Sequence, residues 1–154
     1  SLDVKASVRV ATTANLAGTY NNGNGTITAG SNAAIVIDGV TLSTGNRILV
    51  KDQTTATQNG IYTVTTTGDG ATAFVITRAT DADTNIEITG GTFTFVEEGS
   101  TLANNGFVFT HNGSPTLGST KQFRLFYFVE INFLFFSSFL LLLKFFLKLA
   151  DFLL

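Results

Sequence analysis

The first 123 residues consist of short segments of alternating apolar and polar residues, separated by turns rich in Gly and Asn. Alternation of this kind is typical of β-strands that bury one face. In VKASVRV, residues 4–10, the apolar side chains are expected on one face and the Lys, Ser and Arg side chains on the other. The same pattern predicts further strands at 26–29, 34–42, 47–51, 60–66, 73–79, 92–98 and 106–111.

Asn-Gly, a strong turn-forming pair, begins at positions 22, 24, 59, 105 and 112. Residues 11–17 and 81–87 could each hold one helical turn at most, and no crossover helix separates the strands. Many short strands with regular turns favour an all-β fold, either an antiparallel β-sandwich or a barrel-like domain.

Composition excludes several classes of protein. The 154-residue chain has no Cys, which rules out disulfides and thiolate metal sites, and its net charge of −2 does not favour nucleic acid as a partner. The chain also has no Met, so we expect Ser1 to be a processed end or an internal cut.

The stretch NRILVKDQTTATQNGIYTV, residues 46–64, places three charged side chains close together: Arg47, Lys51 and Asp52. Such a cluster suits either a reactive centre or a structural ion pair. Because two predicted strands flank its loop and Asn59-Gly60 supplies the turn back into the sheet, we expect a surface ion pair in a β-scaffold.

Catalytic groups do not converge in the sequence. His111 is the only imidazole, and its place at the end of a predicted strand favours a polar surface residue. Glu97 and Glu98 are neighbours in a predicted strand, so their carboxylates face opposite sides and cannot act on one substrate atom. We therefore predict no catalytic residues and no enzymatic activity.

The segment DADTNIE, residues 81–87, is the sharpest metal candidate. Asp81, Asp83 and Asn85 match the first alternate ligands of an EF-hand loop, but Ile86 replaces the required Gly and Thr92 replaces the final Glu. We expect a turn whose side chains bind local backbone N–H groups. The Gly-rich stretch at 21–30 lacks the helix and Lys of a phosphate loop. From these two segments together we predict no metal site and no cofactor.

Several separate blocks of the chain resemble one known family. They are SVRVATTANL, IDGVTLSTGNRILVKDQTTATQNGIYTV, RATDADTNIE, GTFTFVEEGSTLANNGFVFT and TLGSTKQF. Together they resemble, over residues 2–123, a β-rich domain of bacteriophage tail-fibre and other virion structural proteins. The chain departs from that pattern at Phe107, where a Trp often stands, and after Phe123, where another strand is expected.

The resemblance implies a non-enzymatic virion structural module, part of a tail fibre or appendage involved in host attachment. Its implied partners are other tail proteins, a homotrimeric assembly within a longer fibre, and a host surface glycan or protein. If the module binds a receptor, we expect it to do so through loops, whose candidates are Thr19–Gly25, Asp52–Gly60, Thr67–Thr72 and Thr80–Glu87.

The composition changes abruptly near residue 123. Residues 123–154 contain 10 Phe and 10 Leu, and no Gly follows Gly118. We treat 1–123 as a β-domain and 124–154 as a hydrophobic tail that is expected to be helical.

Three interpretations of the tail stay open. Its longest uncharged run, Ile131–Leu143, is shorter than the roughly 20 residues of a membrane span, but flanking Lys144 and Lys148 suit a membrane-associated helix. A frameshift in AT-rich coding sequence also produces Phe, Leu, Lys and Asn, and the third interpretation is a buried helix. The alternative function is therefore a cell-surface β-domain that this helix tethers to a membrane. The protein would then be membrane-associated and not part of a virion.

Overall fold

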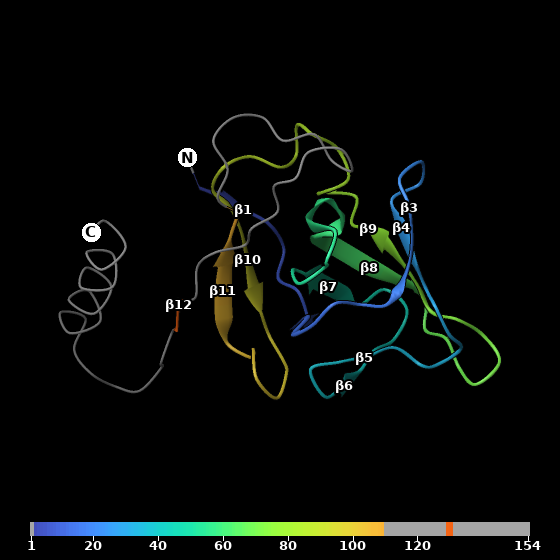
Figure 1. Cartoon of the computed structure of the whole chain (residues 1–154). Helices are drawn as coiled ribbons and strands as arrows, with labels where there is room; N and C mark the ends of the chain where they lie inside the picture. The colour runs from blue at the N-terminus through green and yellow to red at the C-terminus, as the bar shows by residue number, and fades with distance from the viewer. Residues whose placement is uncertain (1, 110–128, 131–154) are drawn as a thin grey trace.

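A computed structural model describes residues 2–109 and 129–130, and it is built from β-strands (Figure 1). The strands in chain order are β1 (Asp3–Val4), β2 (Val10–Ala11), β3 (Gly18–Asn21), β4 (Thr26–Ala29), β5 (Val36–Ile37), β6 (Val40–Thr41), β7 (Arg47–Val50), β8 (Gly60–Thr66), β9 (Val75–Arg78), β10 (Thr92–Val96), β11 (Asn105–Val108) and β12 (Val129–Glu130). A single 3₁₀ turn, η1 (Ala56–Gln58), interrupts the described strands. The predicted all-β class is confirmed for these residues.

The strands form two sheets and a separate hairpin. One sheet has the order β2-β7-β8-β9-β4-β3, the other has the order β1-β10-β11-β12, and β5 pairs with β6 alone. The prediction of a purely antiparallel arrangement is wrong, because β1 runs parallel to β10 and β2 runs parallel to β7. Both exceptions are edge strands, and both come from the same N-terminal segment.

That segment crosses from one sheet to the other, so the prediction of one continuous strand over residues 4–10 is also wrong. The Val8 N–H donates to the Phe95 carbonyl at 2.8 Å, and the next residue, Arg9, donates its N–H to the Arg47 carbonyl at 2.9 Å. Val8 is fully buried, whereas Val4, which the alternation placed on the same face, is 65% exposed. The shared face is lost because the two halves of the segment lie in different sheets.

The six-stranded sheet is buried on both faces at its centre. Ile48 and Val50 of β7 pack into one apolar cluster, and Leu49 between them packs into the other. The four-stranded sheet covers the Leu49 side with Val96, Phe107 and Phe109, and residues from the β5–β6 hairpin cover the opposite side. Burial on both faces accounts for the continuous apolar run of β7.

The β5–β6 hairpin replaces the single strand predicted at 34–42. Its turn has positive φ at Asp38 (47°) and Gly39 (80°), the backbone conformation that an Asp-Gly pair tolerates. The Asp38 carboxylate accepts hydrogen bonds from the backbone N–H groups of Thr101 and Leu102, at 2.8 to 3.0 Å. The hairpin turn is thereby fixed to the connection between β10 and β11.

The described part of the predicted hydrophobic tail is limited to β12. Gly106 pairs with Val129 and Asn105 with Glu130, antiparallel, so two residues beyond 123 complete the edge of the four-stranded sheet. The helical prediction for the rest of 124–154 lies outside the described residues.

We predict that Val8→Ala lowers the free energy of unfolding by about 2 kcal/mol, because it leaves a cavity where the two sheets meet. Val4→Ala is the matched control, and its expected effect is within about 0.5 kcal/mol because Val4 is exposed. Urea unfolding followed by circular dichroism measures both. Equal losses for the two variants would contradict the sheet-crossing geometry.

Candidate functional site

The charged cluster of residues 46–64 is used in structural contacts. The predicted ion pair is present, with Lys51 Nζ lying 3.0 Å from Asp52 Oδ2. Thr12 supports this pair, because its hydroxyl donates to Asp52 Oδ2 at 2.9 Å and accepts from the Lys51 backbone N–H at 3.0 Å. The Lys51 ammonium also lies 5.6 Å from the centre of the Phe107 ring, within the range of a cation–π contact.

Arg47 pairs outside the cluster. Its two terminal nitrogens each lie 3.0 Å from one oxygen of Asp81, in the bidentate geometry that arginine and carboxylate favour. This contact joins the start of β7 to the 80–87 loop. Sequence spacing gave no sign of it, because 34 residues separate the partners.

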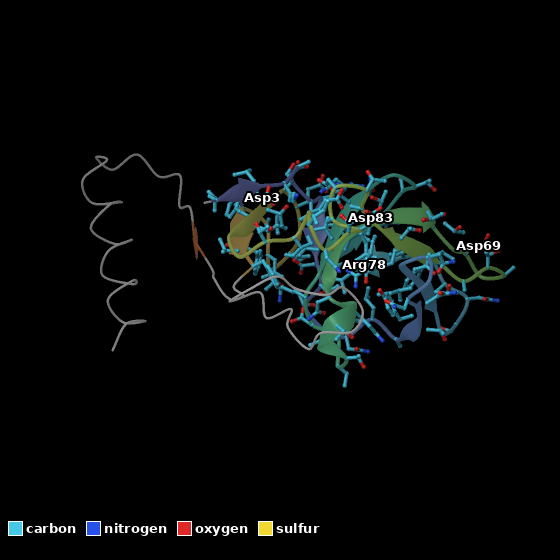
Figure 2. All side chains as sticks on the ribbon, turned by 90° about the horizontal axis from the view of Figure 1, so that it is seen from above. Asp3, Asp69, Arg78 and Asp83 are labelled. Carbon is cyan, nitrogen blue, oxygen red and sulfur yellow. The ribbon has the colours of Figure 1, made fainter. Side chains whose placement is uncertain are left out.

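Arg78 is the most deeply placed charge among the described residues, at 5% exposure (Figure 2). Its guanidinium donates to the Thr57 carbonyl at 2.9 Å, to the Asn59 carbonyl at 3.1 Å and to the Tyr20 hydroxyl at 3.1 Å. The aromatic rings of Tyr20 and Tyr62 lie 5.5 and 5.1 Å from the guanidinium carbon. Three hydrogen bonds and two aromatic rings thus replace the water lost on burial.

Gly60 is needed where the Asp52–Gly60 loop re-enters the sheet, as predicted for the Asn59-Gly60 pair. Its φ is +154°, and a Cβ at this position would lie 2.5 Å from an Arg78 terminal nitrogen. Any side chain here would displace the guanidinium. The next tyrosine, Tyr62, is anchored to the same loop by its hydroxyl, which donates to the Gln58 carbonyl at 2.5 Å. Burial raises the pKa of Tyr62, which favours the protonated hydroxyl that donates this hydrogen bond.

The rest of the Asp52–Gly60 loop is held by amide side chains. The Asn59 side-chain oxygen accepts from the Gln53 N–H at 2.8 Å, and the Gln53 side chain bonds both the N–H and the carbonyl of Leu16. Asn15 accepts from the Thr54 N–H at 2.8 Å. The loop is therefore fixed from both sides, by Arg78 and by residues 15–16.

The carboxylates of the metal candidate at 81–87 are engaged in one contact with a distant residue and in contacts within the loop. Asp81 binds Arg47, and the Glu87 carboxylate accepts from the backbone N–H groups of Asp83 and Thr84 at 3.1 and 3.0 Å. The segment does form a turn with a side chain bonded to local backbone N–H groups, but the acceptor is Glu87 and not the Asp and Asn side chains that were expected to fill this role. Within residues 2–109 and 129–130, no group of three or more His, Cys, Asp or Glu side chains has a metal-binding arrangement.

Glu97 and Glu98, just after β10, contact different partners. Ser7 donates its hydroxyl to Glu97, whereas the Glu98 carboxylate lies 3.1 Å from Arg9 Nε. The two carboxylates therefore serve separate contacts with the N-terminal segment. His111 lies outside the described residues.

The four candidate recognition loops do not form one surface. Arg78 joins Thr19–Gly25 to Asp52–Gly60 through its contacts with Tyr20 and Thr57. The Thr80–Glu87 loop is anchored through Arg47 instead. In Figure 2, Asp69 of the Thr67–Thr72 loop projects at one end of the domain, away from Arg78 and Asp83. Arg78 is the side chain that ties the first two loops together.

Comparison of the chain with models of known protein families found no match, and neither did comparison with curated proteins or with solved structures. In the described part of the chain, no helix is long and apolar enough to span a membrane.

We predict shifted carboxyl pKa values in the 80–87 loop. Partial desolvation and the adjoining Glu87 carboxylate raise the pKa of Asp83, whereas hydrogen bonds from Thr84 and the Asp83 N–H lower the pKa of Glu87. Side-chain carboxyl NMR titration should find Asp83 protonated at a higher pH than an ordinary aspartate, and Glu87 at a lower pH than an ordinary glutamate. Ordinary pKa values for both groups would contradict the contacts described for this loop.

Proposed function

We propose that this protein is a non-enzymatic structural module of a bacteriophage virion, part of a tail fibre or appendage that takes part in host attachment. The observation that carries the proposal is that the charged residues of the 46–64 stretch form ion pairs within the domain. Arg47, Lys51 and Asp52 lie in the longest block that resembles the tail-fibre domain, and each makes an ion pair within the domain. Residues that carry the resemblance therefore have a structural use.

The fixed Asp52–Gly60 loop supports the same proposal. A module that transmits load or presents a surface in a fibre needs loops of constant shape, and rigid positioning is also what a recognition surface requires. Here Gln53 and Asn59 are buried although they are polar, and both form hydrogen bonds within the loop or to residues next to it. These hydrogen bonds account for the polar residues of the loop without a catalytic role.

Its partners on this proposal are other tail proteins, copies of the same chain in a trimer, and a surface glycan or protein of the host. Its location is the virion. The alternative, a cell-surface domain tethered by residues 124–154, depends on a tail that is described here only at Val129–Glu130.

Immuno-electron microscopy with antibodies raised against the full chain tests the proposal. We expect label on the tail or appendages of released particles, and a soluble multimer when the full chain is expressed alone. Label confined to cell envelopes, together with membrane association that survives alkaline washing, would overturn the virion location and favour the tether.

The absence of catalysis is tested separately. The purified full chain should leave host polysaccharide intact. Turnover that is abolished by one carboxylate change, such as Glu97→Gln or Asp81→Asn, would contradict the structural role. Asp69→Asn is the matched control, since Asp69 is exposed and its carboxylate accepts only within its own turn.

A further inference from the structure

The described residues contain four Asn-Gly pairs, which occupy very different surroundings. This dipeptide is chemically labile, because a Gly backbone nitrogen carries no neighbouring side chain to block its approach to the preceding Asn side-chain carbonyl. The pairs begin at Asn22, Asn24, Asn59 and Asn105. Their surroundings decide which of them can react.

Two of the pairs are protected by the fold. Asn59 is buried, and its side-chain oxygen accepts from the Gln53 N–H. Asn105 is buried in β11, paired with Val96 across the strand, and the next residue, Gly106, lies against the Phe93 ring. Their backbones are held in place, so the side-chain carbon cannot swing onto the following nitrogen.

The other two pairs form the exposed turn between β3 and β4. Asn22, Gly23 and Asn24 are all exposed. The Gly23 N–H donates to the Asn21 side-chain oxygen at 2.9 Å, which occupies the nitrogen that would attack Asn22. At Asn24 the hydrogen bond is made by the side-chain carbonyl that would be attacked, because its oxygen accepts from the Thr26 hydroxyl at 3.1 Å.

We propose that Asn24 is a site of spontaneous deamidation and that the Thr26 hydroxyl promotes the reaction. A hydrogen bond to the Asn24 carbonyl oxygen draws electrons from its carbon and stabilises the negative charge that develops on the oxygen during attack. Thr26 thus acts as a built-in donor to the developing oxyanion. The Asn22 side-chain oxygen accepts a longer hydrogen bond from the Tyr20 hydroxyl, at 3.4 Å, and the Gly23 nitrogen that would attack Asn22 is already engaged with Asn21.

The chemistry needs only water. The Gly25 backbone nitrogen forms a bond to Asn24 Cγ, and the bond from Cγ to the side-chain nitrogen breaks. That nitrogen leaves as ammonia with the proton from the Gly25 amide, and a five-membered imide remains. Water then opens one of the two imide C–N bonds, which gives aspartate or isoaspartate at position 24.

The modification changes the surface of one candidate recognition loop. It places a carboxylate next to Gly25, where an added Cβ would lie 3.3 Å from the aliphatic stem of Arg78. The Thr19–Gly25 loop, which has no charged residue before the reaction, becomes negative. The isoaspartate product also lengthens the main chain inside the turn, which weakens the β3–β4 hairpin register.

Peptide mapping by mass spectrometry of the full chain, incubated at mildly alkaline pH, tests the inference. We expect ammonia loss and amide-to-acid conversion at Asn24 first, at Asn22 more slowly, and at Asn59 and Asn105 only after unfolding. In denaturant the four sites should react at similar rates. Similar rates in the folded chain, or faster reaction at Asn22 than at Asn24, would overturn the proposal.

Thr26 variants test the role of the hydroxyl. Thr26→Val keeps the shape of a β-branched residue but removes the donor, and it should slow reaction at Asn24 by about two- to tenfold, the range of one hydrogen bond. Thr26→Ser keeps the donor and should react at close to the parent rate. An unchanged rate in Thr26→Val, with the same thermal midpoint as the parent chain, would show that the hydroxyl plays no part.

Discussion

The buried guanidinium of Arg78 connects three parts of the domain that are far apart in the sequence. It extends from the end of β9, contacts Tyr20 at β3 and binds the Thr57 and Asn59 carbonyls of the loop before β8. A buried charge is costly unless its donors are satisfied. Here the cost is offset only when the loop carbonyls and both tyrosines are in place, so the shape of the loop and the position of the arginine depend on each other.

Two other contacts join the main layers in the same way. The N-terminal segment hydrogen-bonds first to β10 and then to β7, and Asp38 fixes the β5–β6 hairpin to the β10–β11 connection. The N-terminal segment bonds through backbone groups, whereas Asp38 accepts backbone N–H groups with its side-chain carboxylate. The apolar clusters supply the favourable burial, while these polar contacts determine which elements face each other.

Sequence alternation identified most strands because each buries at least one face. The segments predicted at 26–29 and 60–66 coincide with β4 and β8, and the Asn59-Gly60 turn lies where it was expected. The parallel edge strands were missed, because alternation in residues 4–10 carries no information about a change of sheet. Arg78 was missed for a similar reason: in the alternation of β9 it looks like an ordinary polar residue, and its acceptors are backbone carbonyls that any sequence supplies. The bidentate pairing of Arg47 with Asp81 likewise depends on loop packing rather than on spacing.

The central claim is that the polar residues around the Asp52–Gly60 loop act as scaffold, with Arg78 as the fixing contact. Hydrogen–deuterium exchange of residues 53–59 in Arg78→Lys tests it most directly, because lysine keeps the charge but lacks the planar fork that reaches several carbonyls. We predict faster exchange in this loop and a loss of about 2–3 kcal/mol in unfolding free energy. Arg9→Lys, at a partly exposed ion pair, should change neither. Parent-like exchange and stability in Arg78→Lys would contradict the account.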